Sequence, residues 1–167
     1  MTSLKYLSGY SEKVQNQVAD LVAKEALSDV ILRRYPNAHN ITSAKALYDY
    51  AQEIKQSYMR KSPPLSKVIY DDKVHVIQHA LGVHTYVSRV QGSKLKAKNE
   101  IKIATVFRKV PEAFLRMILV HELAHFKEKS HNKAFYKLCQ YMEPEYHQLE
   151  FDMRLYLTHI DAFGELY

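Results

Sequence analysis

Three histidines and a glutamate gather between positions 121 and 131, and their types and spacing fit metal-assisted hydrolysis. His121-Glu122-Leu123-Ala124-His125 forms an H-E-x-x-H motif. Residues four apart share one face of a helix, so the two imidazoles point at the same spot. Glu122 lies one residue beyond the first histidine, close enough to reach a water on a metal without binding the metal itself. The motif therefore predicts a helix that carries two metal ligands and one acid.

A third imidazole follows six residues after His125, at His131, across a polar loop that lets the chain turn back. Three neutral imidazoles and one water form a four-coordinate catalytic zinc site with an open position. We therefore expect one Zn²⁺ per chain, held by His121, His125 and His131. Glu150 is the alternative third ligand, because some zinc sites take a glutamate from a following helix.

Polar side chains further along the chain are candidates for supporting roles. Side chains that could hold a developing oxyanion are Tyr146, His147 and Arg154, with packing or surface positions as the alternative for each. Asp152 or Glu150 could accept a hydrogen bond from a ligand imidazole, with a solvated helix face as the alternative.

Other residues with metal-binding or nucleophilic side chains receive a structural interpretation. His75, His79 and His84 are candidates for a second metal site, and the first two are also four apart, but no acid or thiol nearby completes the set. His39 and His159 are predicted to lie at the surface. Cys139 falls on an apolar helix face and is predicted to be a core residue.

The stretch from His121 to Phe135 reads H-E-L-A-H-F-K-E-K-S-H-N-K-A-F. It resembles the signature of the YgjP-like metallopeptidases: H-E-L-x-H-L, a short charged loop, then N-H-S-x-x-F-[WY]. It is also similar to SprT-like and WLM-type proteases, which share H-E-x-x-H and a later histidine. The resemblance extends over about residues 80–155. It departs from the family pattern at Arg89-Val90-Gln91-Gly92-Ser93, where the family usually has R-W-G-S-C.

The resemblance implies a zincin-like fold and a peptidase mechanism. Zinc lowers the pKa of its bound water toward neutrality, and Glu122 takes the proton as general base and passes it to the leaving amine. In similar zincins the substrate lies antiparallel along an edge strand beside the site. Residues 101–106 are our candidate for that strand.

Apolar spacing and capping residues define the elements that must position this site. Helices are predicted over 11–35 with one interruption, from a Thr42 or Ser43 cap to before Ser62-Pro63-Pro64, over 72–81, from Pro111 to Phe126, from an Asn132 cap to Met142, and over 145–160. The segment 72–81 also fits a strand, with the helix favoured. Residues 83–90 and 101–106 alternate with a period of two and are predicted to form an antiparallel pair, joined by a basic, turn-rich connection at 91–99.

Length and composition indicate a globular fold with its own core. The 167 residues are 47% hydrophobic and 25% charged, enough to bury a core without disulfide bonds. We predict an α+β, zincin-like fold in which a small antiparallel sheet packs on the buried active-site helix. Residues 1–167 form one domain, with 1–62 as a helical N-terminal extension and 63–167 as the catalytic core.

Composition also excludes several classes of site. The 4 glycines cannot form G-x-G-x-x-G or a P-loop. The single cysteine excludes an intrachain disulfide and a C-x-x-C site. No apolar run reaches the length of a membrane span, and the first residues lack the apolar centre of a signal peptide. We therefore expect a cytoplasmic protein without a membrane partner.

The sequence thus predicts a zinc-dependent peptidase acting on a peptide or protein substrate. A nucleic-acid-associated protein with a structural metal is one alternative, since the net charge is +6. A structural site, however, usually closes its fourth position with a protein ligand. A metal-dependent amide hydrolase of a small molecule is the other alternative, which a deep enclosed pocket would favour.

Overall fold

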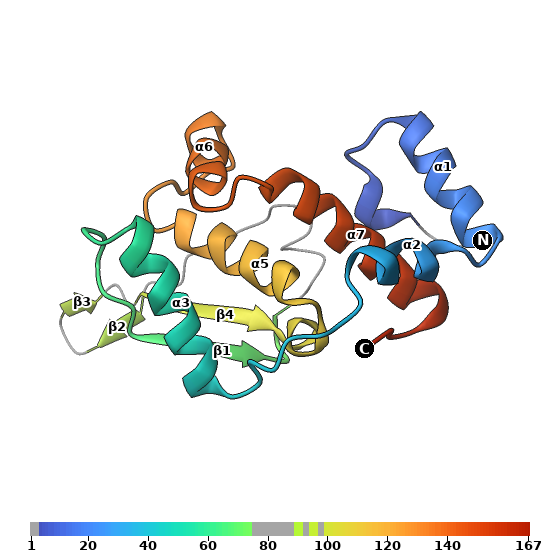
Figure 1. Ribbon diagram of the computed structural model, residues 1–167. Coiled ribbons are helices and arrows are strands. Elements are labelled where there is room, and N and C mark those ends of the chain that lie inside the picture. The colour runs from blue at the N-terminus through green and yellow to red at the C-terminus, as the bar shows by residue number, and fades with distance from the viewer. Residues whose placement is uncertain (1–3, 75–88, 92–93, 97–98) are drawn as a thin grey trace.

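The computed structural model describes residues 4–74, 89–91, 94–96 and 99–167 (Figure 1). Its helices are α1 (Glu12–Ala23), α2 (Leu27–Arg34), α3 (Ala44–Tyr58), α5 (Glu112–Ala124), α6 (Lys133–Met142) and α7 (Tyr146–Phe163). Short 3₁₀ turns are η1 (Lys5–Leu7) and η2 (Thr105–Lys109), and the strands are β1 (Lys67–Asp71), β2 (Arg89–Gln91), β3 (Lys94–Lys96) and β4 (Glu100–Ala104). Within these residues, no helix is both long and apolar enough to cross a membrane.

β4, the strand that precedes α5, has a parallel partner. β1 and β4 run in the same direction, with Val68 opposite Ile101 and Tyr70 opposite Ile103. All four side chains are buried. The predicted antiparallel sheet is therefore wrong for this pair. Parallel neighbours need a crossover of a dozen or more residues, and the segment between β1 and β4 is long enough to provide one.

An antiparallel pair does exist, but in a different place. β2 pairs with β3, so the predicted connection at 91–99 contains a strand of its own. The predicted strand at 83–90 lies outside the described residues except for its end in β2. The predicted helix at 72–81 likewise lies outside them from residue 75 onward.

The helical predictions for residues 11–62 hold, with sharper boundaries. The stripe at 11–35 divides into α1 and α2, and the backbone reverses at Glu25, whose φ is +53°. Ser11 caps α1 by accepting a hydrogen bond from the Val14 amide, and Ser43 caps α3 in the same way. α3 ends at Tyr58, before the predicted proline stop.

Helix α5 is the centre of the core. Figure 1 shows it lying between the β1–β4 sheet and α7, with α3 against the sheet. Its residues from Phe114 to Ala124 are buried except Arg116, so it is surrounded on almost every side as its composition predicted. Leu27, Leu47 and Ile54 from the N-terminal helices belong to the same hydrophobic cluster.

Candidate metal centre

The H-E-x-x-H motif occupies the last turn of α5. The helix predicted from Pro111 to Phe126 is observed as Glu112–Ala124, with Pro111 as its N-cap and His125 as its C-cap, so the motif lies at the C-terminal end of a buried helix. His121, Glu122 and His125 are 6%, 5% and 1% exposed. Burying polar groups at this density requires partners, which a metal would provide for the imidazoles.

The loop after α5 returns His131 to the motif. α6 begins immediately after Asn132, whose side-chain oxygen accepts a hydrogen bond from the Phe135 amide at 2.8 Å. This cap fixes the residue that follows His131. Phe135 is fully buried, and its ring stacks on His125 with centroids 4.5 Å apart and packs edge-on against His121 and His131. The phenyl ring therefore supports all three imidazoles.

The three Nε2 atoms converge. They lie 3.2 Å apart between His121 and His125, 3.0 Å between His125 and His131, and 3.3 Å between His131 and His121. A tetrahedral zinc ion with Zn–N bonds of about 2.0–2.1 Å separates its ligand nitrogens by about 3.3–3.4 Å. The donor set and its spacing therefore fit a zinc-sized ion with one position left for another ligand.

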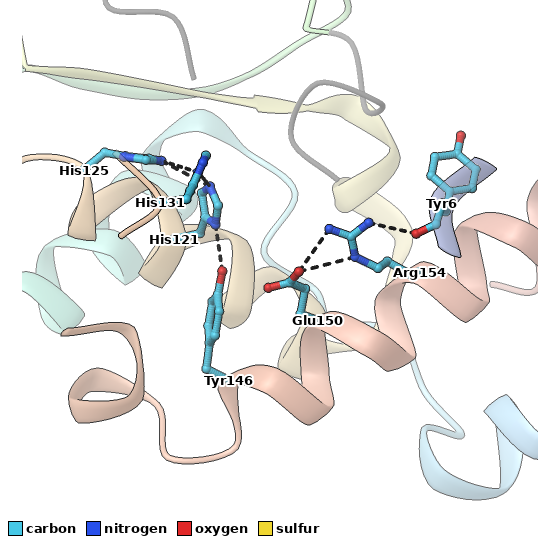
Figure 2. Close-up of polar contacts among 7 residues, drawn as sticks. All are labelled: Tyr6, His121, His125, His131, Tyr146, Glu150 and Arg154. Carbon is cyan, nitrogen blue, oxygen red and sulfur yellow. Dashed lines mark hydrogen bonds and ion pairs between the residues drawn. The ribbon is translucent and has the colours of Figure 1, made fainter. Parts of the chain in front are cut away.

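The Nδ1 atoms of His121 and His125 have hydrogen-bond partners of their own. His125 Nδ1 donates to the Glu128 carbonyl at 3.0 Å, which leaves Nε2 of that ring with its lone pair. Tyr146 Oη lies 2.7 Å from Nδ1 of His121 (Figure 2). Such outer contacts fix ring orientation in metal sites.

A family comparison agrees with the site. The YgjP-like, metallopeptidase domain family matches residues 30–155, which include α5, the loop and α6. The chain belongs to the YgjP-like family. A curated relative from Escherichia coli (strain K12), named UTP pyrophosphatase, is 59% identical over 160 residues, which cover 96% of each chain. No solved structure matches the chain. Family and three-histidine cluster together identify a metal-binding hydrolase.

Glu150, the alternative third ligand, lies outside the cluster in this YgjP-like protein. The metal-binding group found among the described residues consists of His121, His125 and His131. The Glu150 carboxylate is paired instead with Arg154, at 3.0 Å. The three-histidine arrangement expected from the spacing is therefore the one that the structure forms.

The residues predicted to have supporting roles lie in different environments in the structure. Tyr146 is fully buried and contacts His121, whereas His147 is exposed. Arg154 donates to the Tyr6 carbonyl at 2.8 Å. Asp152 accepts hydrogen bonds from the side chains of Arg34, Tyr35 and Gln148. The alternative of a solvated face is wrong for Asp152, which is 3% exposed.

The remaining predictions have mixed outcomes. Cys139 is a core residue, as predicted, and burial raises the pKa of its thiol to about 12. His159 is not at the surface: it is 6% exposed and its Nδ1 donates to the Gly164 carbonyl. His39 is half-buried, with Nε2 near the Phe107 carbonyl. The histidines at 75, 79 and 84 lie outside the described residues.

Sequence reasoning missed the roles of two aromatic residues. The sequence indicated Phe135 only as one position of the family signature. No neighbouring residue indicated that its ring would contact three histidines. Tyr146 was one of several oxyanion candidates, but its contact partner, His121, is 25 residues away in the sequence. Both contacts depend on how α6 and α7 pack on α5.

Proposed function

We propose that this chain is a metal-dependent nucleotide hydrolase that cleaves UTP to UMP and pyrophosphate. The observation that carries the proposal is the 59% identity, over 96% of both chains, to a protein named UTP pyrophosphatase. The three-imidazole cluster with a buried glutamate beside it supports hydrolysis by an activated water. The net charge of +6 suits a polyanionic substrate.

Each residue of the site would have its own role in hydrolysis. His121, His125 and His131 would hold a divalent ion, zinc being the one that the nitrogen spacing fits. When bound, the ion supplies Lewis acidity for a phosphoryl oxygen and lowers the pKa of a coordinated water. Glu122 would accept the proton of the attacking water as general base. Attack at the α-phosphorus breaks the α–β bridge, so water and UTP give UMP and pyrophosphate.

The test is hydrolysis of UTP by the metal-free protein reconstituted separately with Zn²⁺, Mn²⁺ and Mg²⁺. We expect UMP and pyrophosphate as products. Glu122→Gln should keep the bound metal and lose activity by about 10²–10⁴-fold, the usual contribution of a general base. Glu53→Gln, the same change at an exposed position of α3, is the control and should match the unsubstituted protein. Undiminished UTP turnover by Glu122→Gln would contradict the base assignment.

Peptide hydrolysis is the second candidate, favoured by the metallopeptidase description of the family and by the H-E-x-x-H motif. A zincin-like enzyme would bind its peptide or protein substrate beside β4. An unbiased peptide library offered to the same metal-loaded protein separates the two. Cleaved peptides with intact UTP under every metal would replace the nucleotide proposal by a peptidase.

A further inference from the structure

A buried phenyl ring covers one face of the histidine cluster. The ring of Phe135, in the first turn of α6, has its centroid 5.0 Å from that of His121, 4.5 Å from that of His125 and 4.9 Å from that of His131. The three imidazole centroids lie 4.9, 5.1 and 4.7 Å from one another. The four centroids therefore form a nearly regular tetrahedron. Phe135 lies out of the plane of the three imidazole centroids, on one side of it.

The orientation of the rings shows from which side an ion could receive a further ligand. The plane of Phe135 is 26° from that of His125, so the phenyl ring lies against the face of this imidazole. The lone pair of Nε2 lies in the plane of its own ring, so an ion bound by His125 has the phenyl ring to one side of it. His121 and His131 contact the same phenyl ring edge-on. A ligand other than these histidines must therefore approach from the side opposite Phe135.

Water has no place on the phenyl side of the cluster. Phe135 is fully buried, and Cys139 and Met142 continue the buried face of α6. A buried water needs two to four polar partners, and a phenyl ring offers none of ordinary strength. The side chain therefore fills the position that a water would need in order to bind the ion opposite its open face.

We infer that Phe135 is a positioning residue that closes one face of the metal position, so that a bound ion receives water or substrate from the opposite face alone. The inference rests on the metal site of the proposed function and is independent of the identity of the substrate. Phe135 acts through the three imidazoles that it contacts and by excluding a second water.

A size series at this position tests the inference. Phe135→Ala removes the ring and leaves space for water beside the three imidazoles, and Phe135→Val is a milder truncation in case the alanine variant does not fold. Phe135→Leu keeps a large apolar side chain and should preserve the closed face. Phe107→Ala, the same truncation at a buried phenylalanine of η2, is the matched control for a general loss of stability.

The readout is the visible absorption spectrum of the protein saturated with Co²⁺, which takes nitrogen sites similar to those of zinc and, unlike zinc, absorbs visible light. Four-coordinate Co²⁺ absorbs several-fold more strongly than five- or six-coordinate Co²⁺. We expect the strong four-coordinate bands in the unsubstituted protein, in Phe135→Leu and in Phe107→Ala. In Phe135→Ala and Phe135→Val the bands should weaken several-fold, because a second water binds on the opened face. A structural loss alone would not add a ligand.

The outcomes separate this inference from the proposed function. Four-coordinate spectra in Phe135→Ala or Phe135→Val, or an equal weakening in Phe107→Ala, would overturn the role of Phe135. A five- or six-coordinate spectrum in the unsubstituted protein would do the same. The measurement uses no substrate, so failure to hydrolyse UTP leaves its result intact. Conversely, UTP hydrolysis by a protein whose truncated variants keep the four-coordinate bands would retain the function and reject the closed face.

Discussion

At the scale of single residues, the three imidazoles are held by different means. His121 and His125 are fixed by one helical turn and by partners on Nδ1, the Tyr146 hydroxyl and the Glu128 carbonyl. His131 comes from the loop and depends on Phe135 and on the start of α6 for its position. The third nitrogen is therefore the one most sensitive to changes outside α5.

Replacing that third nitrogen should remove tight metal binding. In His131→Ala two donors remain, and we expect Zn²⁺ affinity to fall by more than about 100-fold, beyond the loss typical of an outer-shell partner. Elemental analysis after gel filtration and chelator competition both measure this. His147→Ala, at an exposed histidine, is the control and should retain one zinc per chain. Retention of metal by His131→Ala at unchanged affinity would refute the three-histidine site.

The convergence of the nitrogens was predictable from spacing because it is largely local. Two histidines one helical turn apart must share a face, and a short loop limits how far His131 can travel. The contacts behind the cluster were not predictable in this way. Asp152 meets Arg34 and Tyr35 more than a hundred positions away, and no short-range pattern encodes that meeting.

At the scale of elements, α6 acts as the support of the loop histidine. Its first turn is closed by the Asn132 cap, and its buried face carries Phe135 and Cys139 into the core. A defect at this helix start should therefore reach the metal position, whereas an equal defect at another helix start should not.

Asn132→Ala tests this coupling against Ser11→Ala, which removes the corresponding cap of α1. Each change should lower the free energy of unfolding by about 1 kcal/mol, measured by urea denaturation. Only Asn132→Ala should also weaken Zn²⁺ binding, by about 10-fold, because the backbone next to His131 loses its anchor. Equal zinc affinities in the two variants would show that the cap does not position the histidine.

Helices were predicted better than strands for a physical reason. Caps, prolines and a 3.6-residue period are local features, and they located α1, α2, α3, α5, α6 and α7. β1 was not predicted, because its five residues form a strand by pairing with β4, which lies far away in the sequence. The alternation at 101–106 indicated a strand, which the structure forms over Glu100–Ala104, while 105–106 belong to η2. The direction of the strand depends on its partner, which a period of two does not specify.

In the molecule as a whole, hydrogen bonds to Asp152 connect the N-terminal helical region to α7. This buried carboxylate accepts hydrogen bonds from three side chains. Arg34, at the end of α2, donates from Nη1 at 3.2 Å, Gln148 donates from Nε2 at 3.0 Å, and the Tyr35 hydroxyl is the third donor. Burial and the hydrogen bond to Asp152 raise the pKa of Tyr35 far above its usual value, so the phenol remains a donor. α7 also carries Tyr146, whose hydroxyl contacts His121, so Asp152 and a neighbour of the histidine cluster lie on one helix.

Asp152→Asn should therefore destabilise the protein, which should still unfold in a single cooperative transition. The amide keeps the shape but loses the charge that Arg34 and Tyr35 contact, and it turns one NH₂ group toward donors. We expect a loss of about 1.5–3 kcal/mol in the free energy of unfolding, the usual contribution of a hydrogen bond to a charged group. Asp49→Asn, in the exposed Lys45–Asp49 pair of α3, should leave the free energy of unfolding nearly unchanged.

Circular dichroism and tyrosine fluorescence during urea unfolding should give coincident curves, because the N-terminal helices share one hydrophobic core with α5. Separate transitions would instead indicate that residues 1–62 fold as an independent unit, contrary to the predicted single domain.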